Sequence, residues 1–357
     1  MLPNYTFKRL RSLDAMRGMA ILAMLPFHVL LYGGLALEEA GGEWGAKIPE
    51  LSVVELEQPL GTGLLLFFFV TGMGLTISLA RRSERQSPRE IGRHVILRYG
   101  GYVLAGIFYE NILQKIIFGG GVNAEELVQG IISGTIFSGP IKCLGLTAIL
   151  AFPLILYLSW GKLVATSLVL TPIVGVTLYY VLLPQASNLP TVLIPILTNG
   201  WGILKGLPIV LVGAALAKLV LQGKDVKKKN LTMGSVITAA YVLIPMLLGT
   251  GMLHILIAIW SYHHAVLFTL GTSFFIFGLF QLLETRNINL TPLTVLDRSS
   301  VFVFYGHFSL GIALYLLIGA ENWSMMWLLF EMVVVTAIIW IFFYFYSKWR
   351  WGNPSTW

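Results

Sequence analysis

The feature that most constrains this chain is a series of apolar runs, each long enough to cross a lipid bilayer. A helix that rises 1.5 Å per residue needs about 20 apolar residues to span a hydrocarbon core about 30 Å thick. Runs of this length favour helices, which satisfy their own backbone hydrogen bonds in lipid. We therefore expect an all-α, polytopic integral membrane protein with about ten transmembrane helices. The runs cover residues 18–37, 60–80, 95–118, 141–159, 163–183, 202–221, 231–250, 263–283, 300–318 and 324–346.

The composition supports this class and leaves little material for a separate soluble domain. Of the 357 residues, 56% are hydrophobic and 11% are charged, whereas soluble domains typically carry about 25% charged residues. The polar stretches between the runs are too short to bury a second core. We expect a single integral-membrane domain over residues 1–357, in which residues 1–17 form an amphipathic segment on the cytoplasmic surface.

The basic residues indicate how the chain is inserted. With an even number of spans both termini lie on one side, and most of the 24 Lys and Arg residues fall on that side. Because cytoplasmic loops carry an excess of Lys and Arg, both termini are predicted to be cytoplasmic in a multi-pass protein of the cell membrane. The net charge of +7 is then a consequence of topology, and no nucleic acid partner is expected.

Ionisable residues concentrate at the start of the first expected span. Asp14 and Arg17 precede an apolar segment that contains His28, and ionisable groups at membrane depth are costly and usually functional. Arg17 and His28 are eleven residues apart, so on a helix they share one face and lie about 16 Å apart along the axis. His28 is expected near the bilayer midplane, next to a helix distortion at Pro26.

The role of this stretch has two interpretations. The imidazole of His28 could accept a proton from an attacking hydroxyl or amine and return it to a leaving thiolate. It could equally hydrogen-bond neighbouring helices together. Arg17 could be only the basic residue that orients the first span, paired with Asp14. We keep His28, Arg17 and Asp14 as candidate catalytic residues.

Three segments carry most of a resemblance to a known family, and residues 140–146 add a fainter one to a Leu-x-x-Leu-Gly segment. Residues 13–21 with His28 form the first, residues 66–74 with Thr71 before a glycine form the second, and residues 297–307 form the third. They are similar, in order, to the first-helix motif, the Phe-Phe-x-x-Ser-Gly segment and the late Tyr-x-x-His span of the transmembrane acyltransferase superfamily. The relevant branches are the acyltransferase-three family and the heparan-α-glucosaminide N-acetyltransferase-like family.

The resemblance implies an acyl-CoA-dependent transmembrane O- or N-acyltransferase. Such an enzyme moves an acyl group, commonly acetyl, from cytoplasmic acyl-CoA to a hydroxyl or amine of a glycan or lipid. It implies that His28 is the general base and that Arg17 has a structural or donor-binding role. The heparan-type branch carries its catalytic histidine in the first outer loop, whereas residues 35–59 contain no histidine.

The remaining candidates divide between a donor side and an acceptor side. Basic clusters at cytoplasmic span ends could hold the phosphates of coenzyme A, although such clusters also set topology. Ionisable groups in the outer halves of spans could line an acceptor cavity or pair with one another. The candidate donor-binding residues are Arg81, Arg82, Arg93, Arg98 and Thr71, and the candidate substrate-binding residues are His307, Tyr305, Glu110, Lys205 and Glu331.

Two other readings stay open. A secondary transporter or flippase could use His28, Glu110, Lys205 and Glu331 as an intramembrane relay, although the two halves of the chain show no repeat of the kind that transporters often have. The second is an acyltransferase-like scaffold without activity.

No metal is expected, since Cys143 is the only cysteine and the histidines lack ligand spacing. Membrane lipids are expected partners, and a homo-oligomer stays open.

Overall fold

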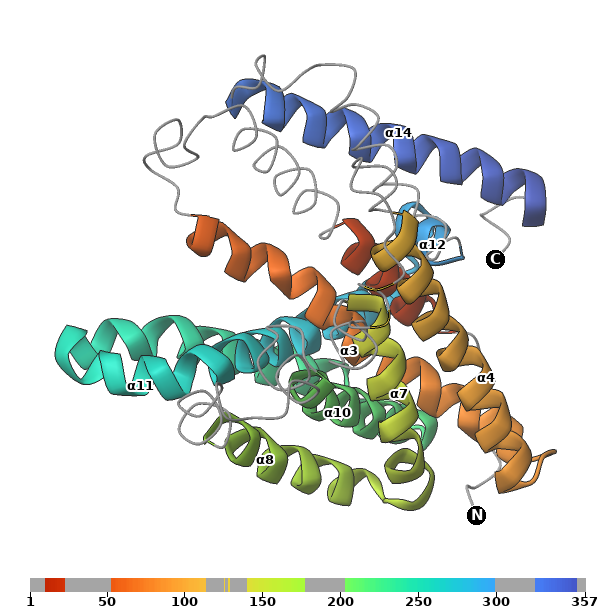
Figure 1. Ribbon diagram of the computed structural model, residues 1–357, viewed down its shortest axis with the longest axis horizontal. Coiled ribbons are helices and arrows are strands. Elements are labelled where there is room, and N and C mark those ends of the chain that lie inside the picture. The colour runs from red at the N-terminus through yellow and green to blue at the C-terminus, as the bar shows by residue number, and fades with distance from the viewer. Residues whose placement is uncertain are drawn as a thin grey trace. The chain divides into compact units, whose positions relative to one another are not determined.

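The computed structural model describes residues 10–22, 53–113, 125, 128, 140–176, 203–298 and 325–351. Every regular element in these ranges is helical (Figure 1), so the expected all-α class is confirmed for the described part of the chain. The chain forms two compact units. The first contains Phe67–Phe275, and the second contains Arg9–Leu66 and Ile276–Trp357. The expectation of a single integral domain stays a prediction.

The helices lie where the apolar runs predict them. Residues 11–22 are helical at the start of the first run, while most of that run and the run at 300–318 lie outside the described residues. The other runs correspond to α3 (Val53–Ser83), α4 (Pro88–Gly106) with the π-helix η1 (Ile107–Leu113), α7 (Pro140–Tyr157), α8 (Trp160–Val176), α10 (Ile203–Leu221), α11 (Lys227–Thr285) and α14 (Met325–Trp351). A short helix, α12 (Thr291–Arg298), precedes the run at 300–318.

Three of the described helices are long and apolar enough to cross a membrane. The spanning stretches are Leu65–Ser83 in α3, Phe268–Thr285 in α11 and Val333–Arg350 in α14, and shorter apolar stretches occupy Ile141–Tyr157 and Gly206–Leu221. These stretches indicate membrane association by length and composition. The expected number of spans and the side of the termini stay predictions.

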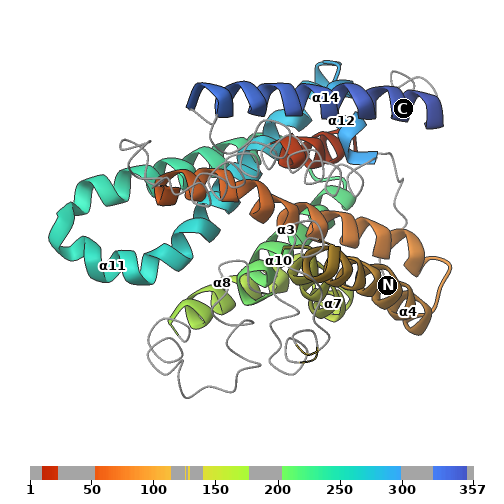
Figure 2. The ribbon, with the colours of Figure 1, turned by 45° about the horizontal axis from the view of Figure 1, so that its top comes forward.

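α11 joins two expected spans, 231–250 and 263–283, in one helix of 59 residues. A straight helix of this length would extend about 90 Å. Instead, the backbone at Gly234 packs against Phe275, and Gly271 packs against Thr238. The two ends of α11 therefore lie side by side, and Figure 2 shows the helix curving back on itself. The two antiparallel limbs match the two expected spans, but the helix continues through the connection.

The centre of the first unit is α10. Its residues 208–218 are buried on every face, which is typical of a helix that is apolar all round. α7 and α8 both pack against α10, and α4 packs against α7. Lys218 in the last turn of α10 donates to the carbonyl of Leu158 just beyond α7, where a cation complements the carbonyl end of a helix.

Small residues allow α3 to cross α10 at close range. A Cβ at Gly72 would overlap the carbonyl oxygen of Val210, and a Cβ at Gly213 would overlap the carbonyl oxygen of Phe69. Glycines at a helix crossing let two backbones approach closely in this way. Gly72 lies in the segment 66–74, one of the segments that carry the resemblance. Because its missing Cβ leaves room for the Val210 carbonyl, its role in this structure is helix packing.

Candidate functional site

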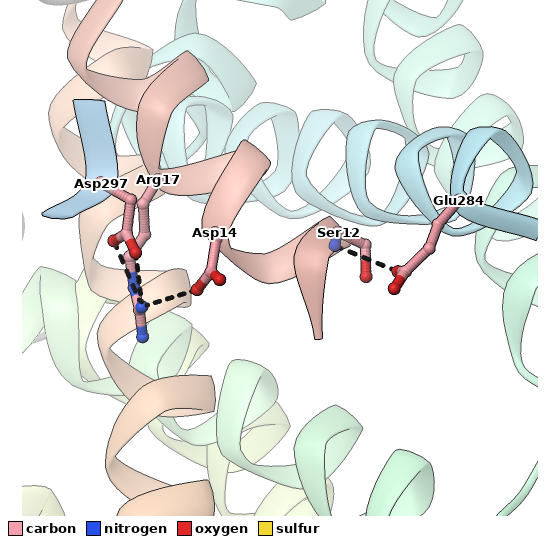
Figure 3. A network of polar contacts seen from close by, with 5 residues as sticks. All are labelled: Ser12, Asp14, Arg17, Glu284 and Asp297. Carbon is pink, nitrogen blue, oxygen red and sulfur yellow. Dashed lines mark hydrogen bonds and ion pairs between the residues drawn. The ribbon is translucent and has the colours of Figure 1, made fainter. Parts of the chain in front are cut away.

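The helix over residues 11–22 starts next to the end of α11. The carbonyl of Leu10 accepts hydrogen bonds from the backbone N–H groups of Leu13 (3.1 Å) and Asp14 (3.3 Å). The N–H of Ser12 donates to Oε2 of Glu284 at 3.1 Å, as Figure 3 shows. A carboxylate at a helix N-terminus satisfies an unpaired N–H and complements the helix dipole. Glu284 therefore fixes the start of this helix.

The surface segment expected over residues 1–17 falls partly within the described residues. Within residues 10–17, Ser12, Leu13, Asp14, Ala15 and Met16 are all buried. In the structure these five residues are covered by other parts of the protein, and the expectation of an amphipathic segment over residues 1–17 stays a prediction.

Two contacts hold α12 in place: one lies in the turn between α11 and α12, and the other lies at the first turn of α12. α11 ends at Thr285. In the turn that follows, Asn287 has a φ of 57°, the left-handed conformation that Asn tolerates, and the N–H of Ile288 donates to the carbonyl of Leu283 at 3.0 Å. The indole Nε1–H of Trp340 in α14 donates to the carbonyl of Pro292 at 2.8 Å. The first turn of α12 is thus anchored to α14.

Gly18 brings the first helix against α12. A Cβ at Gly18 would overlap the carbonyl oxygen of Leu293, so the two backbones meet where the motif at residues 13–21 has its glycine. This close contact places the turn before Gly18, with its ionisable residues, beside the last turn of α12.

Arg17 contacts two carboxyl groups at this crossing. Its Nη1 donates to Oδ1 of Asp14 at 3.4 Å and to Oδ1 and Oδ2 of Asp297 at 3.2 and 3.5 Å. Figure 3 shows both carboxyl groups directed at the guanidinium. The side chains of Asp14 and Asp297 are each 11% exposed and that of Arg17 is 29% exposed. Arg17 thus contacts two acidic side chains at once. Asp14 is 3 residues away in the sequence and Asp297 is 280 residues away.

The environment of Asp297 changes its acidity. Burial raises the pKa of this carboxyl, the charge of Arg17 lowers it, and the charge of Asp14 and a hydrogen bond to it raise it again, with a net rise to about 6. Burial dominates because a desolvated carboxylate loses the stabilisation that water gives its charge. A buried acid that titrates close to neutral pH is a common feature of functional sites.

The expected Asp14–Arg17 pair is present, and Asp297 is the site residue that the sequence analysis missed. Asp297 opens the segment 297–307, where it counted only as part of the resemblance. One feature of the sequence could have pointed to Asp297: it is an acidic residue just before an expected span, on the side of the protein where basic residues dominate. His28, Tyr305 and His307 lie outside the described residues.

The candidate acceptor residues lie on three different helices. Glu110 lies in η1, Lys205 in α10 and Glu331 in α14, and their side chains fall outside the described part. Lys142 of α7 is a further charged residue, which no sequence motif singled out. It is 1% exposed, and a Cβ at Gly106 would lie 2.7 Å from its Cγ, where α4 changes into a π-helix. π-helical turns frequently occur at functional sites.

The candidate donor arginines gather around the connection from α3 to α4. A capping box at Ser87 and Glu90 starts α4: the N–H of Ser87 donates to Oε2 of Glu90 at 2.7 Å, and the N–H of Glu90 donates to Oγ of Ser87 at 3.4 Å. This cap fixes where α4 begins. Arg81 and Arg82 lie in the last turn of α3, Arg93 and Arg98 lie on α4, and Thr71 is half-buried in α3.

His94 lies within this basic cluster. Its pKa is lowered by burial first and then by the positive charges of Arg82 and Arg98. Its Nε2 atom is buried. The charges of Arg82 and Arg98 therefore reach His94 from two helices, and together they make a positive patch suited to an anion.

Two comparisons with known proteins find no match. No family model matches the chain, and no curated protein matches it. The resemblance to the acyltransferase superfamily therefore stands on the three segments quoted from the sequence.

Proposed function

We propose that this protein is a multi-pass membrane acyltransferase. It moves an acyl group, acetyl in the simplest case, from cytoplasmic acyl-CoA to a hydroxyl or amine of a glycan or lipid. The observation that carries the proposal is the ion pair between Arg17 and Asp297. This pair joins the first-helix motif to the start of the late segment 297–307, and these are two of the three segments that resemble the family.

The ion pair also suggests how the proposed reacting groups meet. His28 follows Arg17 by eleven residues, and His307 follows Asp297 by ten. Both expected spans run outward from the cytoplasm, so two continuing helices would carry the histidines about 15–16 Å from the ion pair, to the same depth. In the proposal His28 is the general base, while His307 and Tyr305 bind the acceptor.

The proposed reaction balances without a metal. The acceptor oxygen or nitrogen forms a bond to the thioester carbonyl carbon while its proton passes to His28. The carbon–sulfur bond then breaks, and His28 returns the proton to the leaving thiolate, so coenzyme A departs as the free thiol. Base catalysis of this kind contributes about 10²–10⁴-fold, and holding both reactants in place supplies much of the remainder.

The donor side of the proposal uses the arginine cluster between α3 and α4. Arg81, Arg93 and Arg98 are exposed, and Arg82 is half-buried beside His94. Guanidinium groups bind phosphate through paired, charge-assisted hydrogen bonds, so this cluster suits the phosphates of coenzyme A. The proposal places it at the cytoplasmic face, with about ten spans and both termini on that side.

The surface of α14 fits a lipid environment. Val333, Phe342 and Trp349 are 69%, 60% and 79% exposed, and Lys348 and Arg350 lie in the last turn. A large apolar face needs cover, and an aromatic residue beside two cations is typical of a helix end at the cytoplasmic interface. This arrangement supports α14 as a span that ends on the cytoplasmic side.

The test is acetyl-CoA binding and transfer by the detergent-purified full chain. Saturable binding by calorimetry is expected to weaken about tenfold or more when Arg82 or Arg98 is changed to Ala. Lys228→Ala, an exposed cation at the start of α11, is the matched control and should change nothing. His28→Ala should abolish transfer to glycan or lipid acceptors and leave binding intact. A folded protein that fails to bind acetyl-CoA at millimolar ligand would refute the proposal.

A proton-coupled transporter is the second candidate function. The observation that favours it is the buried acid pair at Arg17, since protonatable carboxyl groups mark proton pathways in transporters. Reconstituted vesicles distinguish the two functions, because a transporter acidifies or alkalinises the lumen when its solute moves, whereas an acyltransferase consumes acyl-CoA.

A further inference from the structure

We infer that a lysine-rich surface, formed by the turn between α7 and α8 and the turn between α10 and α11, binds the headgroup of an anionic phospholipid. This lysine surface belongs to the first compact unit and shares no residue with the arginine cluster proposed for coenzyme A. The inference therefore does not depend on the proposed function. The lysines of the surface are Lys162, Lys218, Lys224, Lys227, Lys228 and Lys229.

Two contacts hold the two turns against each other. Lys218, in the last turn of α10, donates to the carbonyl of Leu158 between α7 and α8. Nζ of Lys224 lies 5.4 Å from the centre of the Trp160 ring, which is within the range of a cation–π interaction. Between these lysines, Gly223 has a φ of 72°, the left-handed conformation that ends a helix. The lysines of both turns therefore lie on one surface of defined shape.

The lysine surface carries a large excess of positive charge. Asp225 is the only acidic residue in the two segments that form it, residues 153–170 and 218–230, which contain six lysines. Oδ2 of Asp225 lies 3.5 Å from Nζ of Lys227, so this acid compensates one lysine. Clusters of four or more cations next to a membrane helix are typical of proteins that bind anionic lipids. The exposed lysines are Lys162, Lys224, Lys228 and Lys229.

Lys218 adds a buried charge to the exposed ones. It is 7% exposed, and its acceptor, the carbonyl of Leu158, carries only a partial negative charge. An ammonium group has three N–H donors, and a buried charge without a full counter-charge is costly. A phosphate group bound at the two turns would supply that counter-charge, because the Leu158 carbonyl lies two residues before Trp160, the ring that contacts Lys224.

The lysine surface lies at the ends of two apolar helices. The apolar stretches Ile141–Tyr157 in α7 and Gly206–Leu221 in α10 both end where it begins. Tyr157 is 74% exposed and Trp160 is 38% exposed. Exposed Trp and Tyr side chains at the end of apolar helices mark the level of the lipid headgroups. The lysines are thus placed where phospholipid phosphates lie.

The helices that leave the lysine surface favour a lipid over a soluble anion. On α8, Val169 and Ile173 follow Lys162 by seven and eleven residues, which places all three on one helix face. Val169 and Ile173 are 56% and 54% exposed. On α11, Val236 follows Lys229 by seven residues and is 61% exposed. Each exposed face begins with a lysine and continues with apolar side chains, which is the order of charged headgroup and acyl chain in a phospholipid.

The test is lipid binding to the full-length protein in an uncharged detergent, with bound lipids counted by native mass spectrometry. Dioleoyl phosphatidylglycerol is the anionic probe, and dioleoyl phosphatidylcholine has the same acyl chains and a phosphate but no net charge. Glycerol phosphate supplies the anion without acyl chains. Lys224→Gln/Lys229→Gln removes two exposed cations from the lysine surface, and the matched control Arg85→Gln/Arg89→Gln removes two exposed cations between α3 and α4.

The wild-type protein should bind phosphatidylglycerol about tenfold or more tightly than phosphatidylcholine, and glycerol phosphate should not displace the bound lipid. Each lysine near an anionic headgroup contributes about fivefold to affinity. Lys224→Gln/Lys229→Gln should therefore weaken phosphatidylglycerol binding about tenfold or more and leave phosphatidylcholine binding unchanged. The control should change either affinity by less than about twofold, because exposed charges at a distance are screened.

Three results would overturn the inference. Equal affinity of the wild-type protein for the two lipids, a measurement that needs no variant to fold, is the result for lysines that only orient the chain in the membrane. Displacement of the lipid by an equal concentration of glycerol phosphate would make the surface a site for a soluble anion. Equal weakening in the control and in Lys224→Gln/Lys229→Gln would show an effect of net charge without a local site.

Discussion

The close crossing of α3 and α10 predicts that two Gly→Ala substitutions, one at the crossing and one away from it, change the free energy of unfolding by very different amounts. Gly72→Ala adds a Cβ that overlaps the carbonyl oxygen of Val210, whereas Gly101→Ala in α4 adds one with no atom within 4 Å. A backbone carbonyl cannot rotate away as a side chain can. The two helices must therefore separate until the Cβ reaches ordinary contact with the oxygen.

The magnitude follows from two opposing effects. Replacing Gly by Ala within a helix gains about 0.8–1 kcal/mol in helix propensity, and this gain is common to both variants. Overpacking costs about 1–3 kcal/mol, and the upper end applies here because Phe68, Phe69 and Val210 are completely buried around the crossing. Gly101→Ala should stabilise by about 1 kcal/mol and Gly72→Ala should destabilise by about 2 kcal/mol, a difference of about 3 kcal/mol.

Denaturant unfolding of the two variants in the same detergent measures this difference directly. Gly213→Ala, which adds a Cβ against the carbonyl of Phe69, should cost a similar amount. The double variant with Gly72→Ala should cost less than the two single losses together, since one separation of the helices relieves both overlaps. Equal free energies of unfolding for Gly72→Ala and Gly101→Ala, within about 0.5 kcal/mol, would refute the close crossing.

Three further predictions concern the second unit and the arginine cluster. The pKa of Asp297 is raised from 3.8 to about 6, so its contribution to stability is fully present below about pH 3.8 and is lost as the pH rises to about 6. The loss is about 3 kcal/mol, and thermal unfolding of Asp297→Asn should lack this pH dependence; the same slope in both proteins would contradict the assignment. Trp340→Phe removes the donor to the Pro292 carbonyl and should cost about 1 kcal/mol, while Trp349→Phe on the exposed end of α14 should cost almost nothing. Ser87→Ala removes the capping box of α4 and should cost about 1 kcal/mol and weaken acetyl-CoA binding through a less ordered arginine cluster; unchanged unfolding would show that the cap contributes nothing.

The parts of this fold that the sequence predicts are those that depend on neighbouring residues. The apolar runs locate α3, α7, α10 and α14 because the length of a run reflects bilayer thickness. The pairing of Asp14 with Arg17 follows from the three-residue spacing of one helical turn. Both kinds of prediction use information contained within a single segment.

The missed features depend on segments that are distant in the chain. Asp297 joins Arg17 across 280 residues, and no local spacing connects them. The continuity of α11 is similar: the two apolar runs predict two antiparallel spans, but neither run predicts that the residues between them stay helical, while Gly234 at one end packs against Phe275 near the other.

The glycines in the segments that carry the resemblance position helices, whereas His28 is proposed to act in the reaction itself, and substitutions can distinguish these two kinds of role. Gly18 and Gly72 each meet a carbonyl of another helix, and Arg17 fixes α12 through Asp297. Substitutions at Gly18 or Gly72 should therefore lower stability and activity together, because they act through helix position. His28→Ala should lower transfer alone, with unfolding and acetyl-CoA binding unchanged. A parallel loss of stability in His28→Ala would make the histidine another packing residue, and the catalytic part of the proposal would be wrong even if acetyl-CoA binds.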